Sequence, residues 1–362
     1  MPDHQIPSNA LDRAHSFCQA YDLRLPILMA PMAGACPPAL AAAICNAGGL
    51  GACGALLMSP SSIESWVTDV RSTTNGAFQL NTWIPDPDPA RNSQHESAVR
   101  EFLGQWGPDV SEDAAQVSLI DFQAQCDAMI AASPRIMSSI MGLYPEDIVT
   151  RMKAEGIHWF ATVTTVSEAL AAEAAGADVL IAQGMEAGGH RGAFDATQAH
   201  ANLVGLFSLV PAVVDAVGIP VVATGGIANS RAIAAALTLG ASAVQVGTGL
   251  LRSDESDTPQ VLADAMAHTK PEDTVATCAF SGRLGRSLKS AYTTAAASVS
   301  APTPAPYPVQ RHLTAAMRKQ ALAASDLSSM QSWAGQSAAY ARVGSASDIV
   351  DALWDEAQEL LP

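Results

Sequence analysis

The sequence predicts an α/β fold, a closed (β/α)8 barrel of the TIM-barrel type. Short apolar runs of strand length alternate with longer amphipathic segments rich in Ala and Leu, as in repeated βα units. Eight such strands in strict alternation with helices favour a closed barrel over an open sheet. Several helix-to-strand junctions carry a glycine before an apolar residue, the pattern of a helix C-cap that feeds a strand. These junctions are Gly156-Ile157, Gly176-Ala177, Gly218-Ile219 and Gly240-Ala241.

The expected strands are, in chain order, residues 26–30, 50–54, 78–83, 135–140, 159–163, 179–183, 221–223 and 243–246. The helices expected between them are residues 38–47, 61–72, 120–132, 145–155, 167–175, 203–217 and 230–239.

Two stretches interrupt this alternation. Residues 85–116 are polar, rich in Pro and loop-like, and residues from about 270 to 340 are too long for one closing helix. In a barrel, extra material that follows strands lies at the carboxyl face and covers the site. We therefore expect a barrel over residues 1–250 with a loop insertion at about 85–116. A lid and substrate-pocket segment is expected over 251–340, and a C-terminal helix packed on the barrel over 341–362.

Composition narrows the function to small-molecule chemistry. The 362 residues are 49% hydrophobic, enough to bury a large core. Lys and Arg number 19 against 35 Asp and Glu, which gives a net charge of −16. A nucleic-acid-binding protein needs a basic surface to neutralise phosphates, and an anionic membrane surface attracts basic segments. The sequence thus predicts neither nucleic acid nor membrane as a partner.

The cysteines and the N-terminal region indicate a reduced, cytoplasmic protein. The six cysteines contain no C-x-x-C pair and lack the clustered histidines of a zinc site, so no metal is expected. The first 17 residues are polar and lack the basic and apolar regions of a signal peptide. Proline and glycine interrupt the apolar stretch 25–44, which excludes a membrane helix there.

Two glycine-rich loops predict a phosphate site. Gly225 and Gly226 follow the seventh strand, and Gly247 and Thr248 follow the eighth. Barrels often bind phosphate between these two loops, where backbone N–H groups and a helix N-terminus meet the anion. The simpler interpretation is that the glycines only make tight turns, but their occurrence in both loops favours phosphate.

His190 is the candidate general base. It lies in the glycine-rich segment 183–192 after the sixth strand, where barrel enzymes place catalytic groups. Imidazole titrates near neutral pH, which suits a proton acceptor. The neighbouring Arg191 is either an anion contact or an ion-pair partner of Glu186.

Four blocks of sequence carry a resemblance to a known family: LPILMAPMAG (25–34), QGMEAGGHRG (183–192), ATGGI (223–227) and QVGT (245–248). Lesser matches are GGLG (48–51), Asn81, FSGR (280–283) and WAGQ (333–336). Together they resemble the FMN-dependent nitronate monooxygenase family, formerly called 2-nitropropane dioxygenases. One departure is Cys36, which stands where the family usually has a small hydroxyl residue and is expected to fill that space.

The resemblance implies FMN as the cofactor and a role for each matched residue. Ala30, Met32 and Gly34 would line the flavin ring, and Asn81 and Gln183 would bond its polar edges. The ribityl chain and phosphate would be held by Gly188, Gly189, Gly225, Gly226, Gln245, Gly247 and Thr248. Gly335 and Gln336 would close over the ring, and His190 matches the catalytic histidine of the family.

Two functions follow from this resemblance. The first is FMN-dependent oxidation of alkyl nitronates by O2 to a carbonyl compound and nitrite, with neutral nitroalkanes left open as substrates. The alternative is an FMN-dependent enoyl-thioester (enoyl-ACP) reductase that uses NAD(P)H and shares the EAGGH stretch (186–190). The Arg that follows His190 favours the first. The sequence leaves open a homodimer as the assembly.

Overall fold

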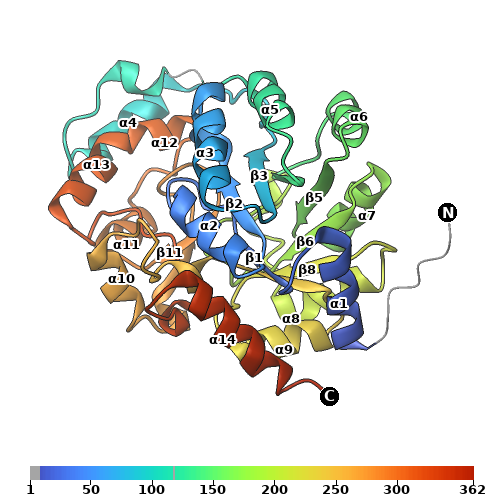
Figure 1. Ribbon diagram of the computed structural model, residues 1–362. Helices are drawn as coiled ribbons and strands as arrows, with labels where there is room; N and C mark the ends of the chain where they lie inside the picture. The colour runs from blue at the N-terminus through green and yellow to red at the C-terminus, as the bar shows by residue number, and fades with distance from the viewer. Residues whose placement is uncertain (1–8, 117–118) are drawn as a thin grey trace.

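The computed structural model describes residues 9–116 and 119–362, so the polar N-terminal stretch lies only partly within it. Its central feature is an eight-stranded parallel sheet in the order β1-β9-β8-β6-β5-β4-β3-β2 (Figure 1). The strands are β1 Ile27–Met29, β2 Gly51–Gly54, β3 Phe78–Trp83, β4 Ile136–Ile140, β5 His158–Val163, β6 Val179–Gln183, β8 Val221–Thr224 and β9 Ala243–Val246. The sheet closes where the N–H of Met29 donates to the carbonyl of Leu50 at 2.8 Å, just before β2. The predicted (β/α)8 barrel is confirmed.

An N-terminal helix that the sequence pattern did not predict covers the amino-terminal face of the barrel. Helix α1 (Ala10–Tyr21) begins at Asn9, whose side chain accepts from the N–H groups of Leu11 and Asp12. Its Phe17 and Tyr21 pack into one buried cluster with the side chains that line the amino ends of the strands. Those side chains are Leu28, Leu50, Ile136, Phe160, Val179, Ile181, Val222 and Ala243. The barrel interior is therefore closed at this face, and a site can open only at the other.

The outer helices are α2 Pro38–Asn46, α3 Pro60–Thr73, α5 Phe122–Ala131, α6 Glu146–Ala154, α7 Val166–Ala174, α8 Leu206–Val214 and α9 Ser230–Thr238. The expected helix 203–217 is shorter at both ends, because Gly205 caps the start of α8 and Asp215 caps its end. Gly156, Gly176 and Gly240 have the positive φ of the predicted C-caps, whereas Gly218 does not. Helix α14 (Ala346–Gln358) packs against α2 and α9, on the side of the barrel where β1 lies between β9 and β2.

The insertion 85–116 was predicted to be loop-like, but in the structure it is partly helical. It contains helix α4 (Ser93–Leu103), which Asn92 caps by accepting from the N–H of His95, and the short helix η2 (Glu112–Ala115). Val99 and Leu103, one turn apart, are buried although most of α4 is polar. This narrow apolar stripe is enough to fold a helix once it has a partner surface.

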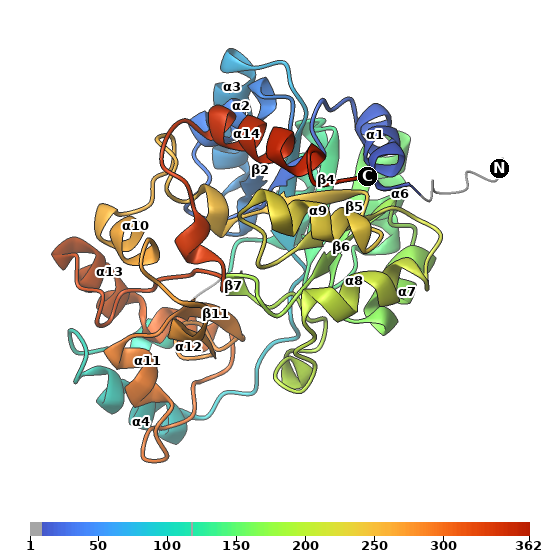
Figure 2. The same cartoon turned by 90° about the horizontal axis from the view of Figure 1, so that it is seen from below.

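The partner surface comes from the segment that follows β9, which contains α10 Gln260–Met266, β10 Thr274–Thr277, β11 Gly285–Leu288, α11 Ala291–Ala296, α12 Val309–Leu313 and α13 Ala315–Ala324. We call residues 85–116 and 251–340 together the lid. Both views show α4 beside α12 and α13 on one side of the barrel (Figures 1 and 2). Val99, Leu103 and Ala115 share a hydrophobic cluster with Phe280, Tyr292, Val309, Leu313 and Met317. The two sequence interruptions therefore fold against each other.

Across residues 9–116 and 119–362, no helix combines the length and apolar character needed to cross a bilayer. Within the same residues, no three His, Cys, Asp or Glu side chains gather closely enough to hold a metal ion.

Candidate active site

The loops that carry the sequence-predicted residues converge at the carboxyl ends of the strands. A Cβ atom added at Gly247, after β9, would lie 3.2 Å from Cβ of Ala30 and 3.5 Å from Sδ of Met32, after β1. A Cβ added at Gly225, after β8, would lie 3.1 Å from the carbonyl oxygen of Gly184, after β6. The structure thus brings together loops from four strands at one face.

The turn after β8 has a backbone conformation that requires glycine at two consecutive positions. Gly225 and Gly226 have φ of +113° and +70°, which residues with a side chain rarely adopt. Thr224 Oγ1 donates to the carbonyl of Gln245 at 2.9 Å, so the ends of β8 and β9 are tied together. Helix α9 begins a few residues later at Asn229, whose side chain accepts from the N–H of Ala232. Two residues with positive φ and a helix N-terminus therefore coincide, which suits an anion. We call the loops that carry Gly225, Gly226 and Gly247 the glycine cradle.

The end of the lid, with the predicted residues Gly335 and Gln336, lies against the glycine cradle. The N–H of Gly335 donates to Thr248 Oγ1 at 3.0 Å, and the N–H of Gln336 donates to the carbonyl of Glu186 at 2.9 Å. A Cβ on Gly188 would lie 2.5 Å from the nitrogen of Gly335. Gly188 is therefore required for the close contact between the loop after β6 and the lid at Gly335.

The interior of the barrel is polar at this end. Asn81 Nδ2 donates to the carbonyl and hydroxyl oxygens of Ser138 at 3.1 and 3.0 Å. Gln79 Nε2 donates to the carbonyl of Met29 at 3.1 Å and to Gln245 Oε1 at 3.3 Å, whereas Gln79 Oε1 is buried without a partner. The sequence analysis missed Gln79. Its position two residues before Asn81 in β3 places both on one face, and that spacing could have found it.

Gln183 serves the loop that follows it. Its Nε2 donates to the carbonyl of His190 at 3.0 Å, and its Oε1 accepts from the N–H of Gly192 at 2.8 Å. Both ends of the amide thus hold the segment that carries His190 in place.

His190 lies on a short strand rather than in the glycine-rich loop that the sequence suggested. Strand β7 (Gly189–His190) pairs antiparallel with β11, and β10-β11-β7 form a second, three-stranded sheet. The imidazole lies between Trp83 at 4.7 Å and Trp333 at 4.8 Å, measured between ring centroids. Its Nε2 is 2.8 Å from Oγ of Ser281. Strand pairing, two indole rings and a hydrogen bond therefore fix the ring.

These surroundings keep His190 uncharged. Burial first, and then the positive charges of Arg283, Arg311 and Arg318, together lower its pKa from 6.5 to about 3. A neutral imidazole carries one proton and one lone pair, so it can both donate and accept a hydrogen bond. It is also a weaker base than the titration of free histidine suggests.

Arg191 holds the loop through backbone carbonyls and forms no ion pair with Glu186. The buried guanidinium donates to the carbonyls of Gln183 at 2.5 Å, Thr164 at 3.2 Å and Asn202 at 3.1 Å. Burial lowers its pKa to about 10. Both carboxylate oxygens of Glu186, in turn, accept from the N–H of Leu206 at the start of α8.

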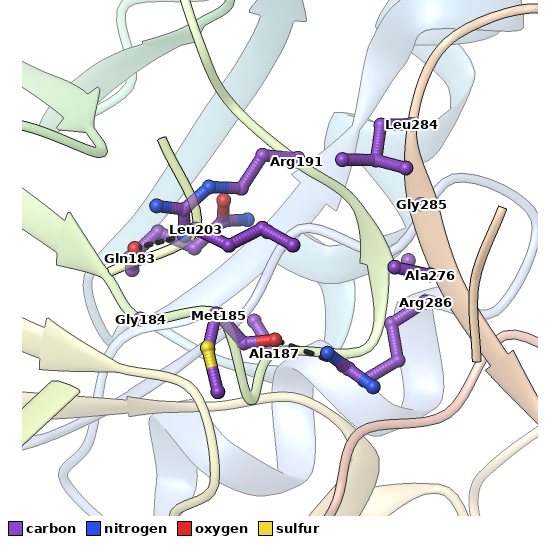
Figure 3. A pocket seen from close by; sticks show the side chains of 11 residues that line it. Gln183, Gly184, Met185, Ala187, Arg191, Leu203, Ala276, Leu284, Gly285 and Arg286 are labelled. Atoms are coloured by element: carbon purple, nitrogen blue, oxygen red, sulfur yellow. Dashed lines mark hydrogen bonds between the residues drawn. The ribbon is translucent and has the colours of Figure 1, made fainter. Parts of the chain in front are cut away.

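A second arginine supports the same loop from the lid. Figure 3 shows Arg286 on β11 reaching across a small pocket, where its Nε donates to the carbonyl of Met185 at 2.8 Å. Arg191 lines the other part of this pocket and is drawn bonded to Gln183. The two arginines therefore hold the loop between β6 and β7 where it leaves β6.

An ion pair that sequence reasoning missed fastens the two parts of the lid. Arg283, which is 2% exposed, pairs through both Nε and Nη2 with the carboxylate of Asp86 in the insertion. Its Nη1 donates to the carbonyl of Ala193 at 3.0 Å. The charge that acts most strongly on His190 is therefore itself held in one place.

Cys36 is a structural residue in the loop after β1. Its Sγ accepts from the N–H of Met32 at 3.0 Å, and Trp66 Nε1 donates to its carbonyl at 3.1 Å. Burial raises the pKa of the thiol to about 12. A protonated thiol is unreactive, so Cys36 holds the Met32 loop in shape.

The fold and the site define a (β/α)8 enzyme with its candidate reaction centre at the carboxyl ends of the strands. The model of the family described as nitronate monooxygenase matches residues 17–356. This chain belongs to the nitronate monooxygenase family, whose members are flavin-dependent oxidoreductases.

Individual relatives agree with this assignment. A probable nitronate monooxygenase of Staphylococcus aureus is 34% identical over 346 residues, which cover 95% of this chain and 97% of that relative. The structure of a nitroalkane oxidase from Streptomyces ansochromogenes matches with a TM-score of 0.86 at 34% identity, over 94% of this chain and 98% of that chain. FabK from Thermotoga maritima matches with a TM-score of 0.75 at 28% identity, over 95% and 96% of the two chains.

The low pKa of His190 predicts how the protein responds to acid. The folded pKa of about 3 lies below the usual 6.5, so below about pH 6.5 the unfolded chain binds a proton that the folded chain does not. The contribution of His190 to stability should be complete above that pH and should decrease as the pH falls. Urea denaturation should show wild type losing more stability than His190→Asn between about pH 7 and about pH 5. An NMR titration of His190 with a midpoint near neutral pH would contradict this expectation.

Proposed function

We propose that this enzyme uses FMN to oxidise alkyl nitronates with O2, giving a carbonyl compound and nitrite. The observation that carries the proposal is the uncharged His190, held between Trp83 and Trp333 beside the glycine cradle and in the field of three arginines. Because nitronates are anions, a positive field at the reaction centre stabilises them there.

The residues present fit FMN. The cradle offers one helix N-terminus and two glycine turns, which suits a single phosphate. The turn between β1 and α2 has no G-x-G-x-x-G motif of the kind that binds a dinucleotide. The unpaired Oε1 of Gln79 leaves an acceptor at the polar end of the barrel, near Asn81 and Gln245. Bound FMN would supply the redox chemistry, while the chain supplies orientation and field.

We assign the predicted cofactor contacts on this basis. Gly34 has φ of +81°, and a Cβ built there would meet nothing within 4 Å, so the loop after β1 borders open space where a flavin ring could lie. Ala30 and Met32 belong to the same loop. The phosphate and ribityl chain are assigned to the residues around the glycine turns, which are Gly188, Gly189, Gly225, Gly226, Gln245, Gly247 and Thr248. Asn81 and Gln183 remain assigned to the polar edges of the flavin, and Gly335 and Gln336 to the cover over its ring.

His190 has different tasks for the two forms of the substrate. A nitronate has already lost its α-proton and needs only to be held. A neutral nitroalkane must first transfer that proton, and an imidazole with a pKa of about 3 accepts it with little driving force. The three arginines partly compensate, because the charge that lowers the basicity of His190 also stabilises the anion formed. We therefore expect preformed nitronates to be the better substrates.

The decisive experiment compares two electron donors under anaerobic conditions. The purified protein should be yellow, and mass spectrometry of the released cofactor should find FMN. Ethylnitronate should bleach the flavin, whereas NADH should not, because the proposed reaction takes its electrons from the nitronate. Aerobic turnover should release nitrite. Bleaching by NADH but not by ethylnitronate would favour the enoyl-thioester reductase instead.

Replacing Gly247 tests the cofactor assignment. Gly247→Val places a branched side chain next to Ala30 and Met32, where we assign the flavin, at a residue whose φ is −110°. FMN binding should weaken about tenfold or more, which corresponds to ~1.4 kcal/mol. Gly218→Val is the matched control, since its Cβ would meet only Glu173 at 3.4 Å, before β8. Gly225 is unsuitable because its positive φ would strain any substitution.

Equal FMN affinity in the Gly247→Val variant and in wild type would remove Gly247 from the cofactor site. Weakening of similar size in the Gly218 control would show that the effect comes from the barrel as a whole.

Replacing His190 separates proton transfer from binding. His190→Asn should lower turnover of neutral nitroalkanes by about 10²- to 10⁴-fold, the usual contribution of a positioned base. Turnover of preformed nitronates should fall far less, and FMN content should stay near that of wild type. Equal losses on both substrates with FMN retained would instead assign His190 to substrate binding, and loss of FMN would assign it a structural role.

A further inference from the structure

Ser281 forms the hydrogen bond that faces His190 from the lid. It is fully buried in the turn between β10 and β11, and its Oγ lies 2.8 Å from Nε2 of His190. Neither the resemblance nor the assigned cofactor contacts give this hydroxyl a task.

The other bonds of Ser281 decide which way the proton between the two side chains points. Its Oγ donates to the carbonyl of Arg283 at 3.1 Å and accepts from the N–H of Arg283 at 3.3 Å. A hydroxyl has one proton and two lone pairs. With its proton given to the carbonyl, the remaining lone pair must receive a proton from Nε2. His190 is neutral, so Nδ1 then carries a lone pair and no proton.

The turn that carries Ser281 is held on both sides. Gly282 has φ of +88°, and a Cβ there would overlap the carbonyl oxygen of Ala305, so the chain packs tightly at this point. Arg283 is fixed by the carboxylate of Asp86. On the other side, strand pairing and the two indole rings hold His190. Neither partner can move away without breaking several other contacts.

We propose that Ser281 is a positioning residue that holds His190 in the tautomer protonated at Nε2 and thereby leaves Nδ1 as the proton acceptor. In the reaction of a neutral nitroalkane, the Nδ1 lone pair takes the α-proton. The electron pair of the broken C–H bond moves into the nitro group, which gives the nitronate and an imidazolium. The substrate part of this inference rests on the proposed function, whereas the tautomer does not.

The tautomer can be measured without any turnover. In the holoenzyme labelled with ¹⁵N-histidine, long-range ¹⁵N–¹H NMR spectra of His190 should show the proton on Nε2, and the signal is assigned by its absence from His190→Asn. Ser281→Ala should lose this single state and give a mixture of tautomers, and Ser281→Thr, which keeps the hydroxyl, should retain it. A proton on Nδ1 in wild type would overturn the proposal, even if no Ser281 variant folds.

Turnover supplies the second readout. In Ser281→Ala, kcat/KM for the neutral nitroalkane should fall about tenfold relative to kcat/KM for the preformed nitronate, the usual effect of one lost hydrogen bond. Ser281→Thr should restore the ratio. An unchanged ratio together with an unchanged tautomer in Ser281→Ala would contradict the proposal. A protein that oxidises no nitronate at all would refute the proposed function, while the NMR result would still decide the role of Ser281.

Ser139→Ala is the matched control. Ser139 is also fully buried, its Oγ accepts from Trp159 Nε1 at 3.0 Å and it donates to the carbonyl of Gly142 at 3.3 Å. The Ser139→Ala variant therefore loses the same kind of hydrogen bonds as Ser281→Ala, but at a residue that does not contact His190. This variant should keep both the tautomer and the substrate ratio of wild type. If it changed them as Ser281→Ala does, the effect would come from general destabilisation and the proposal would fail.

Discussion

The guanidinium of Arg191 is bonded to three carbonyls, at Gln183, Thr164 and Asn202, and the geometry of the site depends on these bonds. They join the ends of β5 and β6 to the segment before α8. Gln183 then fixes the residues on both sides of Arg191, and this determines where β7 meets the lid. A buried charge that donates to backbone carbonyls constrains a loop strongly, because any displacement leaves the charge without partners.

The lid determines the electrostatics of the centre. The chain as a whole carries a net charge of −16, yet the charged groups that act on His190 are arginines, all contributed by residues 283–318. Only one of the three, Arg283, pairs with a carboxylate among the described residues. The indole rings of Trp83 from β3 and of Trp333 from the lid cover His190 and keep water away from it, which strengthens the remaining positive field. The barrel therefore provides the loops of the candidate site, and the lid provides the positive charges around His190.

Sequence reasoning reached the barrel strands because they are continuous apolar runs bounded by turns. It predicted the glycine-rich loops because Gly225 and Gly247 each follow a strand, and the carboxyl ends of barrel strands lie at the same face. It missed the sheet formed by β7, β10 and β11, since a two-residue strand has no periodicity and exists only through its pairing with β11. The pair of Asp86 and Arg283 joins residues far apart in the chain, so only the folded structure shows it. Helix α4 was missed because its buried stripe is narrow and its sequence mostly polar.

The hydrophobic cluster shared by α4 and residues 279–317 also bears on how the family can diversify. Neither segment has a complete core of its own, so a change of shape in one exposes apolar surface on the other. Exchanging only one of them between two relatives would join surfaces that do not match. The two segments should therefore behave as one inherited module, although the barrel strands β4 to β9 separate them in the chain. Recombination that respects the fold would have to transfer both together or leave both in place.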